Sequence, residues 1–542
     1  MTRFPHFDQA TPVLRYSNWI AAALVTFFAV YLHVLFLLNA GGLWRDEVDL
    51  VHLSLLPSVS EVWQNLPHDS CPILMHLVVR AWSGPASLGN TDAGLRVLGL
   101  YVGLFLLLAF WFASWAMRNG APLLAVTLAG LNVTMVRAGD SLRGYGLGSV
   151  LVVLTLAVIW RLSCRPSLAA FSCAVVAAVL SVQSLYPNAF FLFAGCCGGF
   201  VLCAVERRWR DTLPIFAVGA AAAVSLLPYV PLIVRAQDWY IIMKIGFRFS
   251  RGWNQLAVAT GSPLPVFTWV WVALWIGAFL ATIFVIFLRR DRLPHRVRGL
   301  ILFAGTSLVL GTAGFVFFLK LAEYPTQPWN YVPLLAFSAV CLDAMFFTAW
   351  RWARPAAMIL AALTISTAFL FELPSLICRQ TNVDLIAARL STELAPNDYV
   401  IVHPWYFGVT FQRYYKAAAQ WTTLPPLEDH TLQRYDLFKA KMQTKDPIAP
   451  VIDRITSTLQ SGNRVWLVGN FPFSQEPLPE IRPAPNNPWG WSDPPYSFHW
   501  GIQVTQFLSA HGQRSAVVID PSTNCVNTVE NLPVFVATGW KP

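Results

Sequence analysis

Residues 17–39 read SNWIAAALVTFFAVYLHVLFLLN, an apolar run long enough to cross a membrane as one helix. A helix needs about 20 predominantly apolar residues to span the hydrocarbon core of a bilayer. Further runs of this kind predict a polytopic α-helical membrane protein with about eleven transmembrane helices. The other predicted spans cover approximately 94–116, 121–136, 144–163, 167–184, 187–205, 213–234, 264–288, 299–321, 329–349 and 355–376. The first run is too long for a cleaved signal peptide, and we interpret it as an uncleaved signal-anchor.

The composition of the whole chain agrees with this class of protein. Of the 542 residues, 56 % are hydrophobic and 12 % are charged, and the mean hydropathy is +0.52. Soluble domains carry roughly 25 % charged residues, so an ordinary cytosolic enzyme, a disordered protein and a secreted disulfide scaffold are excluded. The net charge of +10 does not indicate nucleic-acid binding, because the arginines lie in short clusters between apolar runs.

These arginine clusters predict the orientation of the chain. With eleven spans and a cytoplasmic N-terminus, the inner loops are all short and basic, as the positive-inside rule requires. The protein is then expected in the inner (plasma) membrane, with its C-terminal part in the periplasm or outside the cell. The arginines of these loops are Arg118; Arg161 and Arg165; Arg207, Arg208 and Arg210; Arg289, Arg290, Arg292, Arg296 and Arg298; and Arg351 and Arg354.

The composition becomes polar after the last apolar run, which divides the chain into a transmembrane module (1–376) and an outer-face domain (377–542). Alternating strand and helix patterns predict a small α/β fold for the second part. The predicted strands are 399–402, 465–468 and 516–519, all interpreted as buried, and the predicted helices are 384–395 and 450–461. Cys378 and Cys525 would both face the oxidising side, where a disulfide between them is one option that the sequence leaves open.

Two adjacent carboxylates follow the first span in Trp44-Arg45-Asp46-Glu47. Carboxylates at the membrane surface beside an arginine can supply a general base or hold a cation. A structural interpretation is also open. Asp46 would then be the N-cap of an amphipathic surface helix over 47–57, with Trp44 in the interfacial aromatic belt.

A second polar segment, His68-Asp69-Ser70-Cys71-Pro72, lies in the long first outer loop at about 40–93. A proline after small polar residues is typical of a helix start. The apolar run that follows to Trp82 is too short to span a membrane, so it predicts a surface or re-entrant helix. Ordinary loop chemistry would also account for these residues.

A third polar segment, Arg137-Ala-Gly-Asp140-Ser-Leu-Arg143-Gly-Tyr145, lies between the third and fourth predicted spans. Charges at the membrane boundary are costly unless they are paired or functional. Arg143, near a helix N-terminus, could bind an anion. Alternatively, Asp140 forms an ion pair with Arg137 or Arg143 that holds the loop.

Other features of the sequence add few constraints on the chemistry. The outer loop at about 235–263 carries Lys244, Arg248 and Arg251 among aromatic residues. The sequence has no CxxC, HExxH or glycine-rich phosphate-loop motif, so it predicts no certain cofactor. A divalent cation could bind at Asp46 and Asp140, although nothing in the sequence requires one.

The order and spacing of the three polar segments resembles the family-39-type glycosyltransferases of the GT-C superfamily, relatives of protein O-mannosyltransferases and the lipid A aminoarabinose transferase. In those proteins an Asp-Glu pair opens the first outer loop, a His-Pro-Pro-Leu-like segment follows, and a Glu-x-Arg-x-Tyr-like element opens the fourth span. The corresponding residues here are Asp46-Glu47, Cys71-Pro72-Ile73-Leu74 after His68-Asp69, Leu95-Arg96-Val97 at the second span, and Asp140-Ser-Leu-Arg143-Gly-Tyr145.

The resemblance covers about residues 15–235 and extends more weakly to Gln327-Pro328-Trp329-Asn330-Tyr331. The chain departs from the family pattern at Cys71 and Ile73, so no histidine role is carried to position 71.

The resemblance implies a membrane glycosyltransferase that moves a sugar from a polyprenyl-phosphate donor to an acceptor hydroxyl on the outer face, with inversion. In this interpretation Asp46 is the general base, and Glu47 orients the acceptor or helps to hold a cation. The lipid phosphate is stabilised by cationic side chains. These are Arg143 first, and Lys244, Arg248 and Arg251 as a second set. Asp140 is the remaining catalytic candidate, and His68, Asp69 and Tyr145 are the substrate-binding candidates.

The sequence leaves the sugar and the acceptor (a lipid, a glycan or a protein) open. Two other classes of protein remain as alternatives, a transporter or flippase of a lipid-linked substrate and a non-catalytic scaffold. Transporters often show internal repeats, and we find no correspondence between the two halves of this chain.

Overall fold

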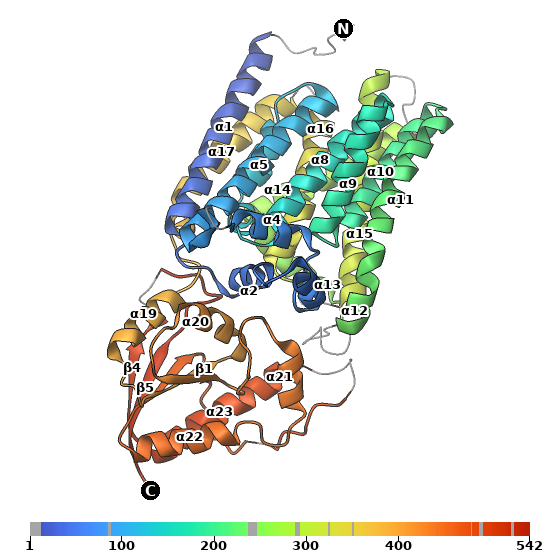
Figure 1. The fold of residues 1–542 in the computed structure, drawn as a ribbon. Coiled ribbons are helices and arrows are strands. Elements are labelled where there is room, and N and C mark those ends of the chain that lie inside the picture. Colours follow the sequence, from blue (N-terminus) through green and yellow to red (C-terminus); the bar gives the residue numbers. More distant parts are fainter. Residues whose placement is uncertain are drawn as a thin grey trace.

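The computed structural model describes residues 12–84, 88–236, 246–287, 293–323, 326–349, 352–478, 480–486, 492–521 and 525–542. Within these ranges, nine stretches of helix are long and apolar enough to cross a membrane, and one shorter apolar helix lies among them. Figure 1 shows them packed side by side in one bundle. They are α1 (Pro12–Asn39), α5 (Asp92–Arg118), α8 (Gly144–Cys164), the shorter α9 (Leu168–Ser184), α10 (Asn188–Val205), α11 (Thr212–Leu226) with η5 (Leu227–Tyr229) and α12 (Val230–Ala236), α14 (Val266–Phe287), α15 (His295–Ala322), α16 (Val332–Ala349) and α17 (Ala353–Phe371).

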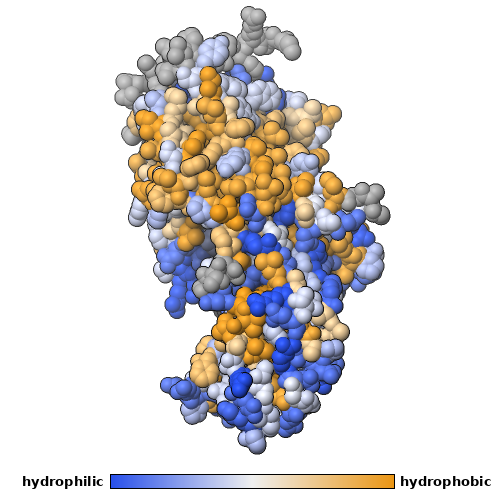
Figure 2. Space-filling model, turned by 90° about the vertical axis from the view of Figure 1, so that its left-hand side faces the viewer, coloured by the Kyte–Doolittle hydropathy of each residue, from blue (hydrophilic) through white to orange (hydrophobic). Residues whose placement is uncertain are grey.

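The surface of the bundle is apolar where a membrane would surround it. Figure 2 shows hydrophobic side chains gathered over the bundle, and hydrophilic ones over the C-terminal part and the boundary between the two. Large apolar side chains project from the bundle, such as Phe27, which is 75 % exposed, and Leu38, which is 74 % exposed. Such a broad exposed apolar surface is not found on soluble monomers. The protein is therefore a multi-pass integral membrane protein.

The segment after α5 is not the continuous helix that the sequence predicts over 121–136. It consists of α6 (Leu123–Ala125), a π-helical turn (η3, Val126–Gly130) and α7 (Val133–Gly139). At its far end the carbonyl oxygen of Asp140 lies so close to Gly99, near the start of α5, that no Cβ would fit there. This broken segment therefore returns the chain to the side where α5 begins. The apolar helix expected at 167–184 is present as α9, which is shorter than the nine candidate spans.

A buried aspartate on α16 fixes the start of the broken segment. Asp343 accepts hydrogen bonds from the backbone N–H of Leu124 at 3.0 Å and from the guanidinium Nε of Arg118 at 3.0 Å. The hydroxyl of Ser114 donates to the same carboxylate at 3.0 Å. Each of these partners donates a hydrogen bond to Asp343. The carboxylate inside the bundle is therefore paired and is not left exposed to hydrocarbon.

The first long loop forms helices that lie across one end of the bundle. They are α2 (Arg45–Ser54), α3 (Val59–Asn65), η1 (Leu66–His68) and α4 (Leu74–Trp82). Figure 1 shows α2 between the bundle and the C-terminal part of the chain. The surface helix predicted up to Trp82 is confirmed as α4. The N-cap of α2 is Trp44, so the interpretation of Asp46 as an N-cap is wrong, and Asp46 lies inside the first turn.

The C-terminal region (377–542) folds around one five-stranded sheet in the order β2-β1-β3-β5-β4. β1, β2 and β3 are mutually parallel, and β5 runs antiparallel to both β3 and β4. The strands are β1 (Tyr399–His403), β2 (Gln420–Thr423), β3 (Val465–Gly469), β4 (Gly512–Ile519) and β5 (Val534–Trp540). The helices are α19 (Val383–Glu393), η7 (Trp405–Phe407), α20 (Gly408–Tyr414), α21 (Tyr435–Met442), α22 (Ala449–Gln460) and α23 (Pro494–His511).

The α/β prediction for this region is confirmed, with one error in burial. The predicted helices match α19 and α22, and the first two predicted strands match the buried strands β1 and β3. The third, within β4, lies at the edge of the sheet and is mostly exposed, so its interpretation as a buried strand is wrong. Apolar residues alone do not separate an edge strand from a central one, because both follow the same pattern.

A disulfide joins the end of the bundle to the last part of the sheet region. Cys378 and Cys525 are bonded, which was one option left open by the sequence. Beside this bond, the N–H of Arg379 donates to the carbonyl of Cys525 at 3.0 Å, and the N–H of Asn527 donates to the carbonyl of Arg379 at 2.8 Å. The cross-link thereby holds the segment before β5 against the end of the bundle.

Candidate active site

Asp46 lies at the interface between the bundle and the C-terminal region, with 17 % of its side chain exposed. Its Oδ1 accepts hydrogen bonds from Nε of Arg45 at 2.9 Å and from Nε2 of Gln433 at 3.2 Å. Burial disfavours ionisation of this carboxyl, but the charges of Arg45 and Arg143 outweigh it and hold its pKa below the usual value. An ionised and partly accessible carboxylate of this kind can accept a proton.

Glu47, the next residue, is fully buried and ties three segments of the chain together. Its Oε1 lies 2.6 Å from Nη1 of Arg96 and accepts the backbone N–H of Leu142 at 3.1 Å. Its Oε2 accepts the backbone N–H of Trp44 at 3.3 Å. Arg96 in turn donates to the carbonyl of Gly42 at 2.7 Å. This carboxylate therefore links the start of α2 to α5 and to the loop before α8.

Arg143, the N-cap residue of α8, lies between Asp46 and the second polar segment. Its Nη2 is 3.1 Å from Oδ1 of Asp69 and donates to the hydroxyl of Ser70 at 3.2 Å, and its Nη1 donates to the backbone carbonyl of Asp46 at 3.2 Å. The buried Nε of Arg143 finds no hydrogen-bond partner among the described residues. One strong donor of this guanidinium is therefore available to an anion.

Asp140 contacts neither of the arginines that flank it in the sequence. Its carboxylate lies 2.8 Å from Nδ1 of His33 in α1. Both ion pairs considered for Asp140, with Arg137 and with Arg143, are therefore wrong, because Arg143 pairs with Asp69 instead.

Asp69 and Asp49 are buried carboxylates that behave differently. Asp69 lies 3.2 Å from Nε2 of His76 on α4, and despite burial the charge of Arg143 and the His76 hydrogen bond lower its pKa. Burial, together with the charge of Asp69, raises the pKa of Asp49 well above the usual value. Asp49 accepts the backbone N–H of Gln433 at 2.7 Å. The surroundings therefore favour the ionised form of Asp69 and the neutral form of Asp49.

An apolar cavity of about 350 Å³ is lined by Asp69 and Ser70, the two residues that Nη2 of Arg143 contacts. Its polar groups come from Asp69, Ser70, Tyr145, Tyr186, Thr326 and Asn330. The amide of Asn330 donates to the hydroxyl of Tyr145 at 3.2 Å. Its apolar wall comes from the turn before α10, from α12, and from the end of α15. The wall residues are Leu66, Pro67, Leu185, Pro187, Leu232, Ile233, Phe315, Phe318, Leu319, Ala322 and Pro333. The shape suits a ligand with a long apolar part and one polar end.

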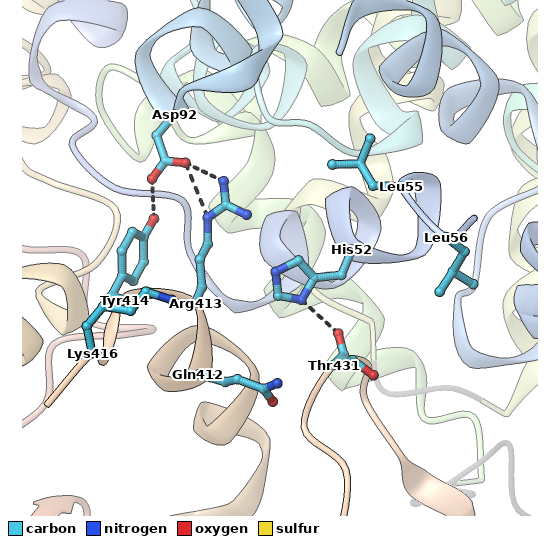
Figure 3. A pocket seen from close by; sticks show the side chains of 9 residues that line it. All are labelled: His52, Leu55, Leu56, Asp92, Gln412, Arg413, Tyr414, Lys416 and Thr431. Atoms are coloured by element: carbon cyan, nitrogen blue, oxygen red, sulfur yellow. Dashed lines mark hydrogen bonds and ion pairs between the residues drawn. The ribbon is translucent and has the colours of Figure 1, made fainter. Parts of the chain in front are cut away.

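A second cavity, of about 640 Å³, lies on the interface between α2 and α20. Figure 3 shows Asp92 of the bundle in direct contact with Arg413 and Tyr414 of the C-terminal region at this cavity. One oxygen of Asp92 accepts from Nη2 of Arg413 at 2.5 Å, and the other accepts from the hydroxyl of Tyr414 at 2.5 Å. Nδ1 of His52 lies 2.8 Å from the carbonyl of Thr431. These contacts fasten the C-terminal region to the end of the bundle.

The remaining predicted residues lie around this arrangement or outside it. Tyr145 lines the apolar cavity, and His68 ends η1. Arg248 is exposed and Arg251 is partly exposed, and neither lines the cavity. They belong to the start of α13 (Phe249–Thr260), which is joined to η6 (Pro328–Tyr331) by the hydroxyl of Tyr331 donating to the carbonyl of Gly252 at 2.9 Å. Lys244 lies outside the described residues.

The part of the chain that the structure describes contains no group of three or more histidine, cysteine, aspartate or glutamate side chains that could hold a metal ion. The two carboxylates suggested for a divalent cation have different partners, since Asp46 contacts Arg45 and Gln433 whereas Asp140 contacts His33.

Sequence reasoning missed several residues of this arrangement. His33 is the only histidine in the first span, which otherwise has no charged side chain, and an ionisable residue inside a span is itself a signal of function or pairing. Gln433 and Glu530 gave no such signal. Both lie in the C-terminal region and contact the start of α2. Gln433 contacts Asp46, from which it is separated by more than 380 residues, and Glu530 contacts Arg45.

Among the comparisons with known proteins, only the one with solved structures finds similar proteins. No family model matches the chain, and no curated protein sequence matches it. Among solved structures, ArnT from Cupriavidus metallidurans bound to undecaprenyl phosphate is similar over 96 % of this chain and 98 % of that chain, with a TM-score of 0.51 and 14 % identity.

Two weaker similarities concern other glycosyltransferases. The Archaeoglobus fulgidus oligosaccharyltransferase aligns with 82 % of this chain and 67 % of its own, with a TM-score of 0.49 and 11 % identity. The arabinosyltransferase EmbB from Mycobacterium smegmatis aligns with 64 % of this chain and 31 % of its own, with a TM-score of 0.37 and 16 % identity. The full-length similarity to ArnT, together with the bundle and the α/β region described above, shows that the chain has the same fold as ArnT.

Proposed function

We propose that the protein transfers a sugar from a polyprenyl-phosphate donor to an acceptor hydroxyl at the interface between the bundle and the C-terminal region. The observation that carries this proposal is the apolar cavity with Arg143 behind its polar end. An isoprenoid chain would occupy the apolar wall, and its phosphate would meet the hydroxyl of Ser70, which accepts a hydrogen bond from the guanidinium of Arg143. The similar structure of ArnT holds undecaprenyl phosphate, a ligand of this chemical class.

In this proposal Asp46 removes the proton of the acceptor hydroxyl. Arg143 links the two substrates, because its guanidinium contacts both Ser70 in the cavity and the backbone carbonyl of Asp46. The oxygen of the acceptor attacks the anomeric carbon while the bond to the lipid phosphate breaks, and Arg143 stabilises the negative charge that develops on the departing phosphate. Attack from the face opposite the phosphate inverts the anomeric centre.

Glu47 serves this site as a positioning residue, and Asp140 stabilises the fold around it. Glu47 is fully buried against Arg96, and Asp140 is buried against His33. Glu47 holds the start of α2, which carries Asp46, and Asp140 holds the loop that leads to Arg143. Arg248 and Arg251 remain a second set of cations near the lipid headgroup, in the segment that follows the undescribed Lys244.

The arginines support an orientation with the proposed site on the outer face. Arg118 ends α5, Arg161 lies near the end of α8, Arg296 lies near the start of α15, and Arg354 lies near the start of α17. These are the ends of the helices away from the C-terminal region (Figure 1). Under the positive-inside rule this end is cytoplasmic, and the C-terminal region, residues 377–542, is then an extracytoplasmic domain attached to the membrane module, residues 1–376.

The test is to incubate the purified protein with a panel of labelled undecaprenyl-phosphate monosaccharides, first in detergent and then in liposomes. A transferase passes the sugar to an added acceptor hydroxyl or, without one, hydrolyses the donor with water, and it releases undecaprenyl phosphate in both cases. A flippase moves the donor across the liposome membrane without consuming it, and a scaffold does neither. Movement without consumption would overturn the proposed reaction in favour of transport.

A further inference from the structure

A glutamine side chain of the C-terminal region, Gln433, contacts Asp46. Nε2 of Gln433 donates to Oδ1 of Asp46 at 3.2 Å, and the backbone N–H of the same residue donates to Asp49, one helical turn further along α2, at 2.7 Å. Gln433 is 6 % exposed. Both of its donors therefore face the acidic side of α2.

The orientation of the Gln433 amide is fixed from its other end. The hydroxyl of Tyr435 donates to Oε1 of Gln433, which leaves Nε2 as the group that faces Asp46. A flipped amide would place two acceptors against each other, Oε1 of Gln433 and Oδ1 of Asp46. Tyr435 itself packs against Trp405 at a ring-centroid distance of 5.1 Å, so its hydroxyl is held by the core of the C-terminal region.

The segment that carries Gln433 is held rigidly. Asp429 accepts the backbone N–H of Thr431 at 2.9 Å and the guanidinium of Arg434 at 2.6 Å, and Arg434 also binds Asp436 at 2.7 Å. Leu432 is buried in one cluster with Leu53 of α2, Leu66 of η1 and Leu232 of α12, which belongs to the bundle. The segment 429–434 is thus closed on itself by ion pairs and anchored to the bundle by an apolar side chain.

We infer that Gln433 is a positioning residue for the proposed base, so that the C-terminal region completes the active centre by orienting the carboxylate of Asp46. The inference rests on the proposed function, because it assigns Gln433 a role only if Asp46 accepts a proton. A donor on Oδ1 fixes the rotation of the carboxyl group and leaves Oδ2 to face the acceptor. It also favours the ionised form, which is the form a base needs.

Gln433→Ala in the full-length protein removes the side-chain donor and keeps the backbone N–H that binds Asp49. With the undecaprenyl-phosphate monosaccharide that the wild type consumes, we expect kcat to fall on the order of tenfold and the donor KM to stay within about twofold. The acidic limb of the kcat profile should move to higher pH, because the ionised form of Asp46 loses a stabilising donor. Gln433→Glu should move that limb further, since it brings a second carboxylate to Asp46.

The matched control is Gln412→Ala, which removes a glutamine from the same interface on α20 without touching Asp46 (Figure 3). It should leave kcat and the pH profile unchanged. Tyr435→Phe is the second variant, which keeps Gln433 but frees its amide to flip, and it should lower kcat less than Gln433→Ala with the same direction of pH shift.

The outcomes separate the inference from the function on which it rests. Wild-type kcat and an unmoved acidic limb in Gln433→Ala and Gln433→Glu would overturn the positioning role while the transferase stands. If Gln433→Ala does not fold, wild-type kcat and an unmoved acidic limb in Tyr435→Phe would also overturn the positioning role. Failure of the wild type to consume any donor of the panel would overturn the proposed function, and the positioning role with it.

Discussion

The imidazole of His33, inside the first membrane span, lies 2.8 Å from the carboxylate of Asp140, which follows 107 residues later. The contact is buried on both sides, with 4 % and 2 % of the two side chains exposed. Gly103 of α5 passes over the pair so closely that a Cβ there would lie 2.1 Å from Oδ1 of Asp140 and 2.5 Å from Nδ1 of His33. Three segments of the bundle therefore meet where α7 ends, and the loop to Arg143 begins at that point.

Replacing His33 by leucine should lower stability much more than activity. The change leaves the Asp140 carboxyl buried without its partner, and breaking a buried pair in this way costs about 3–5 kcal/mol. We expect a lower unfolding temperature in detergent, measured by intrinsic fluorescence, and near-normal turnover per folded molecule. Asp140→Asn should behave in the same way but more mildly. Loss of turnover in Asp140→Asn at wild-type stability would instead make Asp140 a member of the catalytic group.

Asp46→Asn should abolish transfer while folding and lipid binding persist. The amide has nearly the same size but cannot accept a proton at neutral pH, and loss of a general base costs typically 10²–10⁴-fold in rate. The measurement is donor consumption per monodisperse protein, together with binding of undecaprenyl phosphate. The matched control is Asp49→Asn, one turn along the same helix. Since burial raises the pKa of Asp49 and favours its neutral form, its amide should retain most of the activity. Full activity in Asp46→Asn would rule out Asp46 as the base.

Arg143→Ala should weaken use of the lipid donor strongly. A charge-assisted contact to phosphate contributes about 1.5–3 kcal/mol, which corresponds to roughly a tenfold to hundredfold loss in kcat/KM. Arg143→Lys should recover only part of this loss, because lysine lacks the planar fork. Arg137→Ala, six residues earlier, is the control and should not alter donor kinetics. Donor kinetics at the wild-type level in Arg143→Ala would reduce Arg143 to an ion-pair partner of Asp69.

Reporter fusions test the orientation. A phosphatase that is active only outside the cytoplasm should be active when it is fused after Pro542 and inactive when it is fused after Arg208. A reporter that fluoresces only in the cytoplasm should give the opposite signal at each of the two positions, which controls for expression. Cytoplasmic behaviour of the fusion at Pro542 would place the proposed site on the wrong face of the membrane.

Local patterns in the sequence predicted those parts of the molecule that depend on neighbouring residues. Apolar runs predicted the helices of the bundle, and the motif around Asp46 predicted a surface helix at the position of α2. The interruption over 121–136 could not be predicted, since it depends on Asp343, which lies on α16 more than 200 residues away. The partner of Asp140 was missed for the same reason. Two arginines flank it in the sequence, but a histidine from another helix lies closer in space.

Only some residues of the candidate site could be predicted from the sequence, for a related physical reason. Asp46, Arg143, Asp69 and Tyr145 belong to motifs with a recognisable spacing, and the structure gathers them around one cavity or next to it. Gln433 belongs to a loop whose shape is set by Asp429, Arg434 and Asp436. No local pattern marks a glutamine as a hydrogen-bond donor to a distant carboxylate, because this role exists only after the sheet region has docked on α2.

The distance along the chain between Asp46 and Gln433 has a consequence for biogenesis. The two residues are separated by 387 positions, and ribosomes add about 5–20 residues per second, so about 20–80 s pass between their synthesis. During that time the bundle can insert into the membrane with Asp46 already in place but without its donor. If Gln433 orients the base, a chain that stops early would be anchored and inert. Activity would then report that translation, export and docking of the last third have all been completed.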